Sequence, residues 1–289
     1  MSKNISRSKN IAGLGYIHRA SPVHRLTGAS KLLMVLLVSI AAMITYDTRF
    51  LLTVIAGALT VFGLSRIKFR ELRTIFYLIT LFMLLNNLFI FLFSPEEGVK
   101  IYGSRHEITH LWGKYTLVQE QLFYQLNVTI KYFSIMPLAF VFFVTTEPSE
   151  FAASLSRIGV SYKIGYSVAL ALRYIPDVRR VYYDISQAQQ ARGIDLSRKA
   201  TLFARIRGTT AILFPLVFSS LDRIETISNA MELRSFGKNK KRTWYKGRAF
   251  TGWDYAVVVC SVLMIVFSLM LNRGNGGRFY NPFVRLSID

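Results

Sequence analysis

Five long apolar stretches constrain the fold of this chain more than any other feature. They occupy residues 32–46, 50–64, 76–93, 126–145 and 253–271. A helix needs about 20 mostly apolar residues to cross a bilayer, so the first two stretches predict short spans or a tight helical hairpin. The gap "DTRF" between them favours the hairpin. We therefore predict an all-α integral membrane protein with about five transmembrane helices.

The net charge and the hydrophobic content together distinguish a basic membrane protein from a nucleic-acid-binding protein. It carries a formal net charge of +20, yet 52% of its 289 residues are hydrophobic. A nucleic-acid-binding protein of this size would have no core large enough to bury several long apolar runs. We expect the partner of the chain to be a lipid bilayer and not a nucleic acid. The single cysteine, Cys260, excludes a disulfide within the chain.

The distribution of Lys and Arg predicts the orientation, because these residues stay cytoplasmic in short loops. Residues 1–31 hold six basic and no acidic side chains, whereas 94–125 hold three basic and four acidic ones. Residues 146–252 contain 18 of the 36 Lys and Arg. The predicted organisation is therefore a cytoplasmic N-terminal segment (1–31), four transmembrane helices (32–145) with an extracytoplasmic loop (94–125), cytoplasmic helices (146–252), a last transmembrane helix (253–271) and a tail (272–289).

The cytoplasmic segment contains "YSVALALRYIP" and "TTAILFPLVFSSL", which are too short to span and too apolar to lie in water. We interpret it as long amphipathic helices along or just under the membrane. Ser161, Gly165 and Ala169 are spaced four residues apart and form a small-residue face. Another membrane protein could approach this face closely, and so could a helix of the same chain.

One helix end occurs twice in the cytoplasmic segment. The stretch "DISQAQQARGID" (184–195) is followed 42 residues later by "TISNAMELRSFG" (226–237). The identical positions are Ile185 and Ile227, Ser186 and Ser228, Ala188 and Ala230, and Arg192 and Arg234. A helical pattern at i, i+3, i+4 and i+7 precedes each arginine, apolar throughout in the first copy and with Ser228 at i+4 in the second, which predicts the last turns of two amphipathic helices. Gly193 and Gly237 are the expected left-handed exits.

The two arginines have two interpretations. An arginine in the last turn of a helix can bond the free carbonyls and stabilise the negative end of the helix dipole, which would explain each one alone. Their pairing instead suggests two similar receptors, such as the two subunits of a dimer. Arginine suits that role because its planar fork binds carboxylates and carbonyls while its stem packs on apolar walls.

These motifs resemble a known family. "YSVALALRYIPDVRRVYYDISQAQQARGID" and "AMELRSFG" are similar to the two arginine motifs of the transmembrane T component of energy-coupling-factor transporters, the EcfT/CbiQ family. "SPVHRLTGASKLL" is similar to the N-terminal signature of that family, in which a Ser-Pro-x-His-x-Leu run leads to a lysine before the first span. The resemblance extends from about Ser21 to Leu271.

The resemblance implies a scaffold in a bacterial or archaeal cell membrane that joins two EcfA-type ATP-binding-cassette ATPases to a substrate-binding S component for vitamin or metal-ion uptake. Arg192 would dock in one ATPase and Arg234 in the other. The surrounding docking residues would be Ala188, Ala191, Gly193, Ala230, Glu232 and Ser235. The face of Ser161, Gly165 and Ala169 would pack against the S component. The chain itself would be neither an enzyme nor a cofactor-binding protein.

Two other classes compete with the scaffold. The chain has no G-x-x-x-x-G-K-[ST] phosphate loop, so any ATPase must be another chain. Asn86, Asn87 and Lys131 are polar groups inside the predicted spans and would suit a secondary transporter, which would transport without ATPases.

The stretch "HEITH" from His106 to His110 matches the H-E-x-x-H pattern of zinc proteases. That pattern works on a helix, where both histidines share one face and Glu107 acts as general base. Here it lies in a predicted polar loop, and Glu120 is the nearby candidate for a third ligand. We interpret the match as chance and expect no metal site; bound zinc, or proteolysis lost in Glu107→Gln, would favour a membrane metalloprotease.

Overall fold

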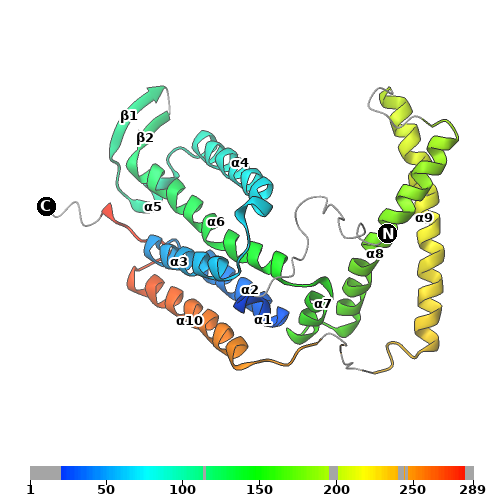
Figure 1. Ribbon diagram of the computed structural model, residues 1–289. Helices are drawn as coiled ribbons and strands as arrows, with labels where there is room; N and C mark the ends of the chain where they lie inside the picture. The colour runs from blue at the N-terminus through cyan, green and yellow to red at the C-terminus, as the bar shows by residue number, and fades with distance from the viewer. Residues whose placement is uncertain (1–20, 113–114, 195–200, 240–243, 245–246, 284–289) are drawn as a thin grey trace. The chain divides into compact units, whose positions relative to one another are not determined.

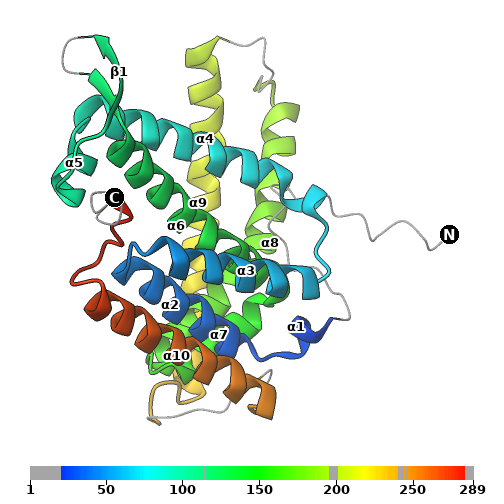
Figure 2. The ribbon, with the colours of Figure 1, turned by 90° about the vertical axis from the view of Figure 1, so that its left-hand side faces the viewer.

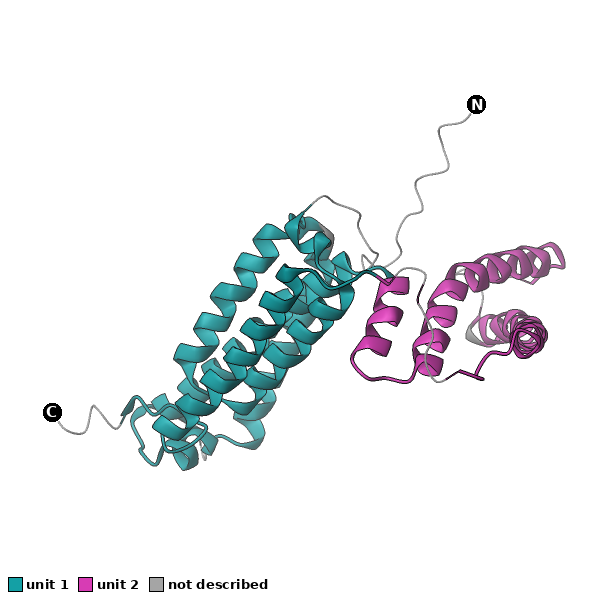
Figure 3. Cartoon of the chain, turned by 90° about the horizontal axis from the view of Figure 1, so that it is seen from below, with its two compact units in different colours: residues 1–147, 248–289 teal, residues 148–247 magenta. Residues whose placement is uncertain are grey.

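The computed structural model describes residues 21–112, 115–194, 201–239, 244 and 247–283, with the elements labelled in Figure 1. Residues 1–20 of the predicted N-terminal segment, Asp195 of the first repeat and residues 284–289 of the predicted tail lie outside this part. The chain divides into two compact units (Figure 3). Unit 1 comprises residues 1–147 and 248–289, and unit 2 comprises residues 148–247.

Unit 1 contains the five predicted apolar stretches, and all five form helices, the first of which ends at Ile44, two residues before the predicted end. Its elements are α1 (Pro22–Arg25), α2 (Gly28–Ile44), α3 (Thr48–Leu64), α4 (Phe69–Phe93), α5 (Glu97–Tyr102), β1 (Glu107–Trp112), β2 (Tyr115–Val118), α6 (Gln119–Thr145) and α10 (Gly252–Gly274). The helices α4, α6 and α10 are long and apolar enough to cross a membrane, and α2 and α3 are shorter apolar helices of 17 residues. The helical membrane fold is thus confirmed. The helix α6 begins at Gln119, earlier than the predicted start at 126.

The core of unit 1 lies where α2, α3, α6 and α10 pack side by side (Figure 2). Phe50, Leu51 and Val54 of α3 are buried against Val38 and Ala41 of α2. Ala41 adds almost no side-chain bulk, and α10 packs closely on α2 there, with Ser268 Oγ donating to the Ala41 carbonyl at 3.1 Å. The helix α4 packs mainly on α6 and leaves most of its leucines and several aromatic rings exposed, as expected for a surface in contact with lipid acyl chains.

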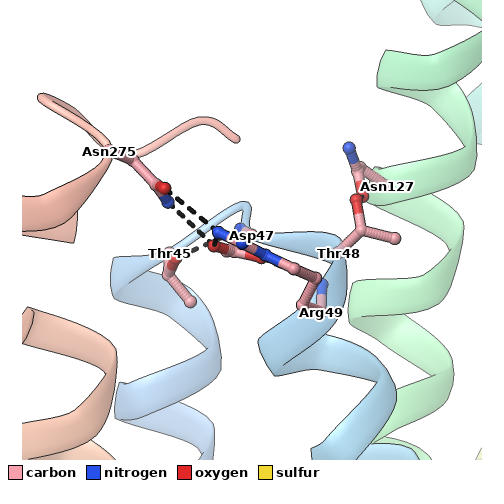
Figure 4. A network of polar contacts seen from close by, with 6 residues as sticks. All are labelled: Thr45, Asp47, Thr48, Arg49, Asn127 and Asn275. Carbon is pink, nitrogen blue, oxygen red and sulfur yellow. Dashed lines mark hydrogen bonds and ion pairs between the residues drawn. The ribbon is translucent and has the colours of Figure 1, made fainter. Parts of the chain in front are cut away.

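A polar network closes the α2–α3 turn (Figure 4). Asp47 caps α3 and accepts hydrogen bonds from the Arg49 backbone N–H at 2.9 Å and from Asn275 Nδ2 at 2.8 Å. Thr48 Oγ1 donates to Asn127 Oδ1 at 2.7 Å. Burial alone would raise the pKa of Asp47, but the hydrogen bonds from Arg49 and Asn275 hold that pKa below its ordinary value. The turn is therefore tied to both α6 and the end of α10.

The described residues of unit 2 form three helices, α7 (Pro148–Arg157), α8 (Tyr162–Ala191) and α9 (Leu202–Leu233). The helix α7 packs on α8, and α9 runs antiparallel to α8 (Figure 1). A cavity of about 440 Å³ lies between α8 and α9, and Val178, Val181, Ile227 and Met231 are among the side chains that line it. The two apolar faces that the repeat predicted therefore face each other across this cavity.

Candidate functional site

The first copy of the repeat ends α8 with a Schellman motif, a pair of backbone hydrogen bonds around a left-handed residue. Arg192 is the capping residue, and Gly193 follows with a φ of +86°. The Gly193 N–H donates to the Gln190 carbonyl at 2.9 Å, and the Ile194 N–H donates to the Gln189 carbonyl at 3.1 Å. Gly193 is thus the left-handed exit, as the sequence predicted.

The second copy ends α9 with the same motif. Arg234 is the capping residue, the Ser235 N–H donates to the Glu232 carbonyl at 2.8 Å, and the Phe236 N–H donates to the Met231 carbonyl at 3.0 Å. The left-handed residue of this motif is Ser235, with a φ of +55°; the predicted exit, Gly237, is also left-handed, with a φ of +95°, but it follows the motif and does not form it. The motif requires the left-handed residue directly after the cap, and Gly237 lies two positions too late.

The side chains of the two arginines do not cap their own helices. Arg192 and Arg234 are both exposed, and neither guanidinium makes a hydrogen bond or ion pair within the described ranges. The carbonyls of Gln189 and Met231, which an arginine could have satisfied, already accept backbone N–H groups. Helix capping therefore does not account for either side chain. The other predicted docking residues are also exposed: Ala188, Ala191, Gly193, Ala230, Glu232 and Ser235.

The two arginine-bearing ends lie at opposite ends of the α8–α9 pair. Phe236, just after the second end, packs its ring 4.8 Å from that of Tyr166 near the start of α8. Near the first end, Gln189 Nε2 donates to the Ala211 carbonyl in the early part of α9 at 3.3 Å. Since α8 has 30 residues, it is about 45 Å long. The pair therefore presents two separate, similar surfaces.

The small-residue face is partly used inside unit 2. Gly165 is buried, and a Cβ added there would lie 2.9 Å from the Ala152 carbonyl oxygen and 3.2 Å from the Trp244 ring. Of the two other members, Ser161 is the N-cap of α8 and is exposed, and Ala169 is half-buried. The glycine therefore serves contacts within the chain.

The "HEITH" stretch does not have the geometry of a zinc protease. Most of it forms strand β1 rather than the predicted loop, so its histidines do not share a helical face. His106 instead places Nδ1 2.5 Å from Glu120 Oε1, and the His106 backbone N–H donates to Oε2 of the same carboxylate at 3.0 Å. Across the described part of the chain, no three His, Cys, Asp or Glu side chains are grouped to hold a metal ion.

The polar side chains in the spans take part in contacts between helices. Asn87 Nδ2 donates to Thr129 Oγ1 at 3.0 Å, which joins α4 to α6. Lys131 Nζ donates to the Met43 carbonyl at 3.1 Å and lies 3.6 Å from the centroid of the Tyr46 ring. Both contacts hold helices together.

Two buried charged groups, Lys31 and Asp254, were not among the predicted site residues. Lys31 ends the signature "SPVHRLTGASK", and Asp254 falls inside the predicted last span. The sequence did carry a signal for Asp254, because Thr251 and Asp254 have the spacing of a capping box before an apolar run. Both side chains have no exposed surface.

The fold and these helix ends define a helical membrane protein with a separate unit of paired helices that carries two matched, arginine-bearing ends. A family model for CbiQ, described as a cobalt transport protein, matches residues 19–245. The chain therefore belongs to the CbiQ family, as the resemblance predicted.

Curated relatives share most of its length. The energy-coupling factor transporter transmembrane protein EcfT of Exiguobacterium sibiricum is 26% identical over 279 residues, which cover 93% of this chain and 98% of the relative. EcfT of Brevibacillus brevis is 27% identical over 279 residues, which cover 92% of this chain and 97% of the relative. EcfT of Thermotoga maritima is 27% identical over 264 residues, with 87% and 91% covered. These similarities extend through both units of the chain.

Proposed function

We propose that this chain is the scaffold that couples two cytoplasmic ATP-binding-cassette ATPases to a substrate-binding membrane S component, for uptake of a vitamin or a metal ion. In this proposal the chain is a non-catalytic subunit. ATP-driven closure of the ATPase pair moves α8 and α9, and their motion reorients the S component. The family membership and the EcfT relatives support the transporter class, and the helix ends support the docking of two ATPases.

The observation that carries the proposal is the pair of identical Schellman ends, each with an exposed arginine that has no partner in the described residues. A structural arginine would be expected to bond its own helix or a neighbouring element. Two such side chains at opposite ends of one antiparallel pair suit two similar receptors. The subunits of an ATPase dimer present the same groove twice, and the two helix ends would fill both grooves.

The chemistry of docking follows from the fork of each guanidinium. Arg192 and Arg234 would donate to carboxylates or carbonyls in the ATPase groove, while Leu233, which is 87% exposed, would pack on apolar walls. A desolvated anchor of this kind contributes about 2–4 kcal/mol to assembly. An arginine that interacts only with the helix dipole would contribute less than about 1 kcal/mol.

The S component would contact exposed apolar side chains of unit 2. Phe214, Phe218 and Leu221 of α9 are each more than half exposed. Ser161 and Ala169 of the small-residue face would add a position of close approach on α8. The basic charge of residues 146–252 supports a cytoplasmic location for this unit and for the N-terminus.

The test is co-purification. The tagged chain is expressed with the ATPases of its host, solubilised in mild detergent, and compared with Arg192→Glu, Arg234→Glu and the double variant. We expect the wild type to retain both ATPases, each single variant to bind them more weakly, and the double variant to lose them.

The matched control is Arg180→Glu, an exposed arginine in the middle of α8 that undergoes the same charge reversal. The control should keep both ATPases. A wild type that binds no ATPase, or a double variant that binds them as tightly as the control, would exclude the docking proposal.

A further inference from the structure

The chain passes between its two units twice, and both passages begin at a helix end of unit 1. It leaves unit 1 after Glu147, just beyond the C-terminal end of α6 at Thr145. It returns at Arg248, just before the N-terminal end of α10 at Gly252. These two helix ends are therefore where the chain connects unit 2 to unit 1.

A buried lysine holds the first of these points. Lys31 has no exposed surface, and its Nζ donates to the Thr145 carbonyl at 2.8 Å and contacts Thr145 Oγ1 at 3.4 Å. Thr145 is the last residue of α6. A cation is favoured at a helix C-terminus because the last carbonyls carry partial negative charge. The lysine thus binds α6 at its final residue.

A buried aspartate holds the second point. Asp254 has no exposed surface, and its Oδ1 accepts from the Thr27 N–H at 2.8 Å and from Ser30 Oγ at 2.5 Å. Its Oδ2 accepts from the Thr251 N–H at 2.8 Å and from Thr251 Oγ1 at 2.7 Å. One carboxylate therefore caps the N-termini of both α2 and α10, where the helix dipoles favour negative charge.

The partners of both points lie on one turn of chain at the start of α2. Thr27 and Ser30 bind Asp254, and the next residue, Lys31, binds Thr145. We infer that residues 27–31 act as a hinge anchor, which holds the two connections of unit 2 on one rigid turn. On the proposed function, from which this inference starts, Lys31 and Asp254 are positioning residues. They hold the two connecting segments in place, so that motion of unit 2 moves the helices of unit 1 and is not absorbed by flexible connections.

The same unit offers matched controls away from the connections. Lys131 is a second buried lysine whose Nζ donates to a backbone carbonyl, that of Met43. Asp47 is a second buried aspartate at a helix N-terminus, bonded by Arg49 and Asn275. If these buried charges served only stability, replacing Lys31 and Asp254 would affect coupling no more than replacing Lys131 and Asp47. The hinge anchor predicts that only the first pair affects coupling.

The first experiment compares Lys31→Met and Asp254→Asn with Lys131→Met and Asp47→Asn in the assembled transporter in proteoliposomes. The measured quantity is ATP hydrolysed per substrate molecule transported. Loss of a buried charged hydrogen bond should loosen a connection by about tenfold, so we expect this ratio to rise about tenfold in the first two variants. The controls should keep the wild-type ratio, and Lys31→Arg, which retains the cation, should restore it in part.

The second experiment needs no ATPase. Amide hydrogen exchange of the isolated chain in detergent should be faster at residues 146–150 and 247–253 in Lys31→Met and Asp254→Asn, and unchanged there in the controls. Should a variant fail to fold, Ser30→Ala keeps the Asp254 charge and removes its shortest bond, together with the contacts of Ser30 Oγ with Thr27, and gives the same readout. Equal exchange in both pairs would exclude the anchor. A wild type that binds no ATPase would exclude the proposed function but leave this measurement decisive for the anchor.

Discussion

Unit 1 and unit 2 are both helical, but they differ in where their large side chains go. In unit 1, α2, α3 and α6 bury Val38, Phe50, Leu51 and Leu138 in one shared cluster. In unit 2, the 32 residues of α9 include one buried hydrophobic side chain, Ile212, among those described. Most helical stability comes from tertiary packing of an apolar face. Within unit 2, α9 therefore leaves most of its described apolar side chains exposed, whereas α2, α3 and α6 of unit 1 bury theirs against one another.

The largest effect that would sharpen this comparison comes from matched truncations. Phe50→Ala removes a side chain that is 1% exposed and should lower the free energy of unfolding by about 3–5 kcal/mol, because it leaves a cavity between α3 and its neighbours. Phe214→Ala removes a side chain that is 64% exposed and should change the free energy of unfolding by less than about 0.5 kcal/mol. Denaturation of the isolated chain in detergent measures both. Similar losses would contradict the difference between the units.

A somewhat smaller loss of stability should follow from a substitution in the polar network of unit 1. Asp47→Asn weakens charged hydrogen bonds from Arg49 and Asn275 and should cost about 2 kcal/mol at neutral pH. Because the pKa of Asp47 is lower in the folded chain, its contribution is present above the ordinary value of about 4 and is lost as pH falls through the folded value.

The measurement for Asp47 is the melting temperature of wild type and variant from pH 7 downward. The two curves should converge at acidic pH, where the wild-type carboxylate also becomes neutral. A gap between the curves that stays constant over this range would show that the charge of Asp47 does not stabilise the turn.

A third test concerns the two units in the assembled transporter. Binding of the ATPases should slow amide exchange in the last turns of α8 and α9 by about tenfold or more, which corresponds to about 1.4 kcal/mol of local protection. The middle of α3 should change little, since it is already packed. Hydrogen exchange with and without the ATPases measures this. Equal protection in both units would mean that the ATPases stabilise the whole chain and not its helix ends.

The smallest effect distinguishes the two helix ends from each other. Ser235 has a left-handed backbone that costs a non-glycine residue about 1 kcal/mol, so Ser235→Gly should stabilise the end of α9 by about that amount. Gly193→Ser should destabilise the end of α8 by a similar amount. Local exchange at Phe236 and Ile194 reports each change. Effects of the same sign at both ends would contradict the equivalence of the two motifs.

Several features were predictable because they depend on neighbouring residues. The apolar stretches became helices, and the repeat became two helices that end with the same motif. The exit at Ser235 was missed because a serine rarely adopts a left-handed conformation, and Gly237 was the more obvious choice. The "HEITH" motif was a misleading match, since its strand conformation follows from pairing with β2.

What the sequence by itself determined is the membrane class, the helices and the matched arginine ends, because length, apolar periodicity and capping are local properties. Only the tertiary structure decided which distant groups meet. Asp254 and Ser30 are 224 positions apart, and Lys31 and Thr145 are 114 apart. Helices that are apolar on nearly every face can pack in many rotations, so their sequences do not specify which polar groups will face each other. Packing of the whole bundle selects one arrangement, and that arrangement brings the two connections of unit 2 onto one turn of α2.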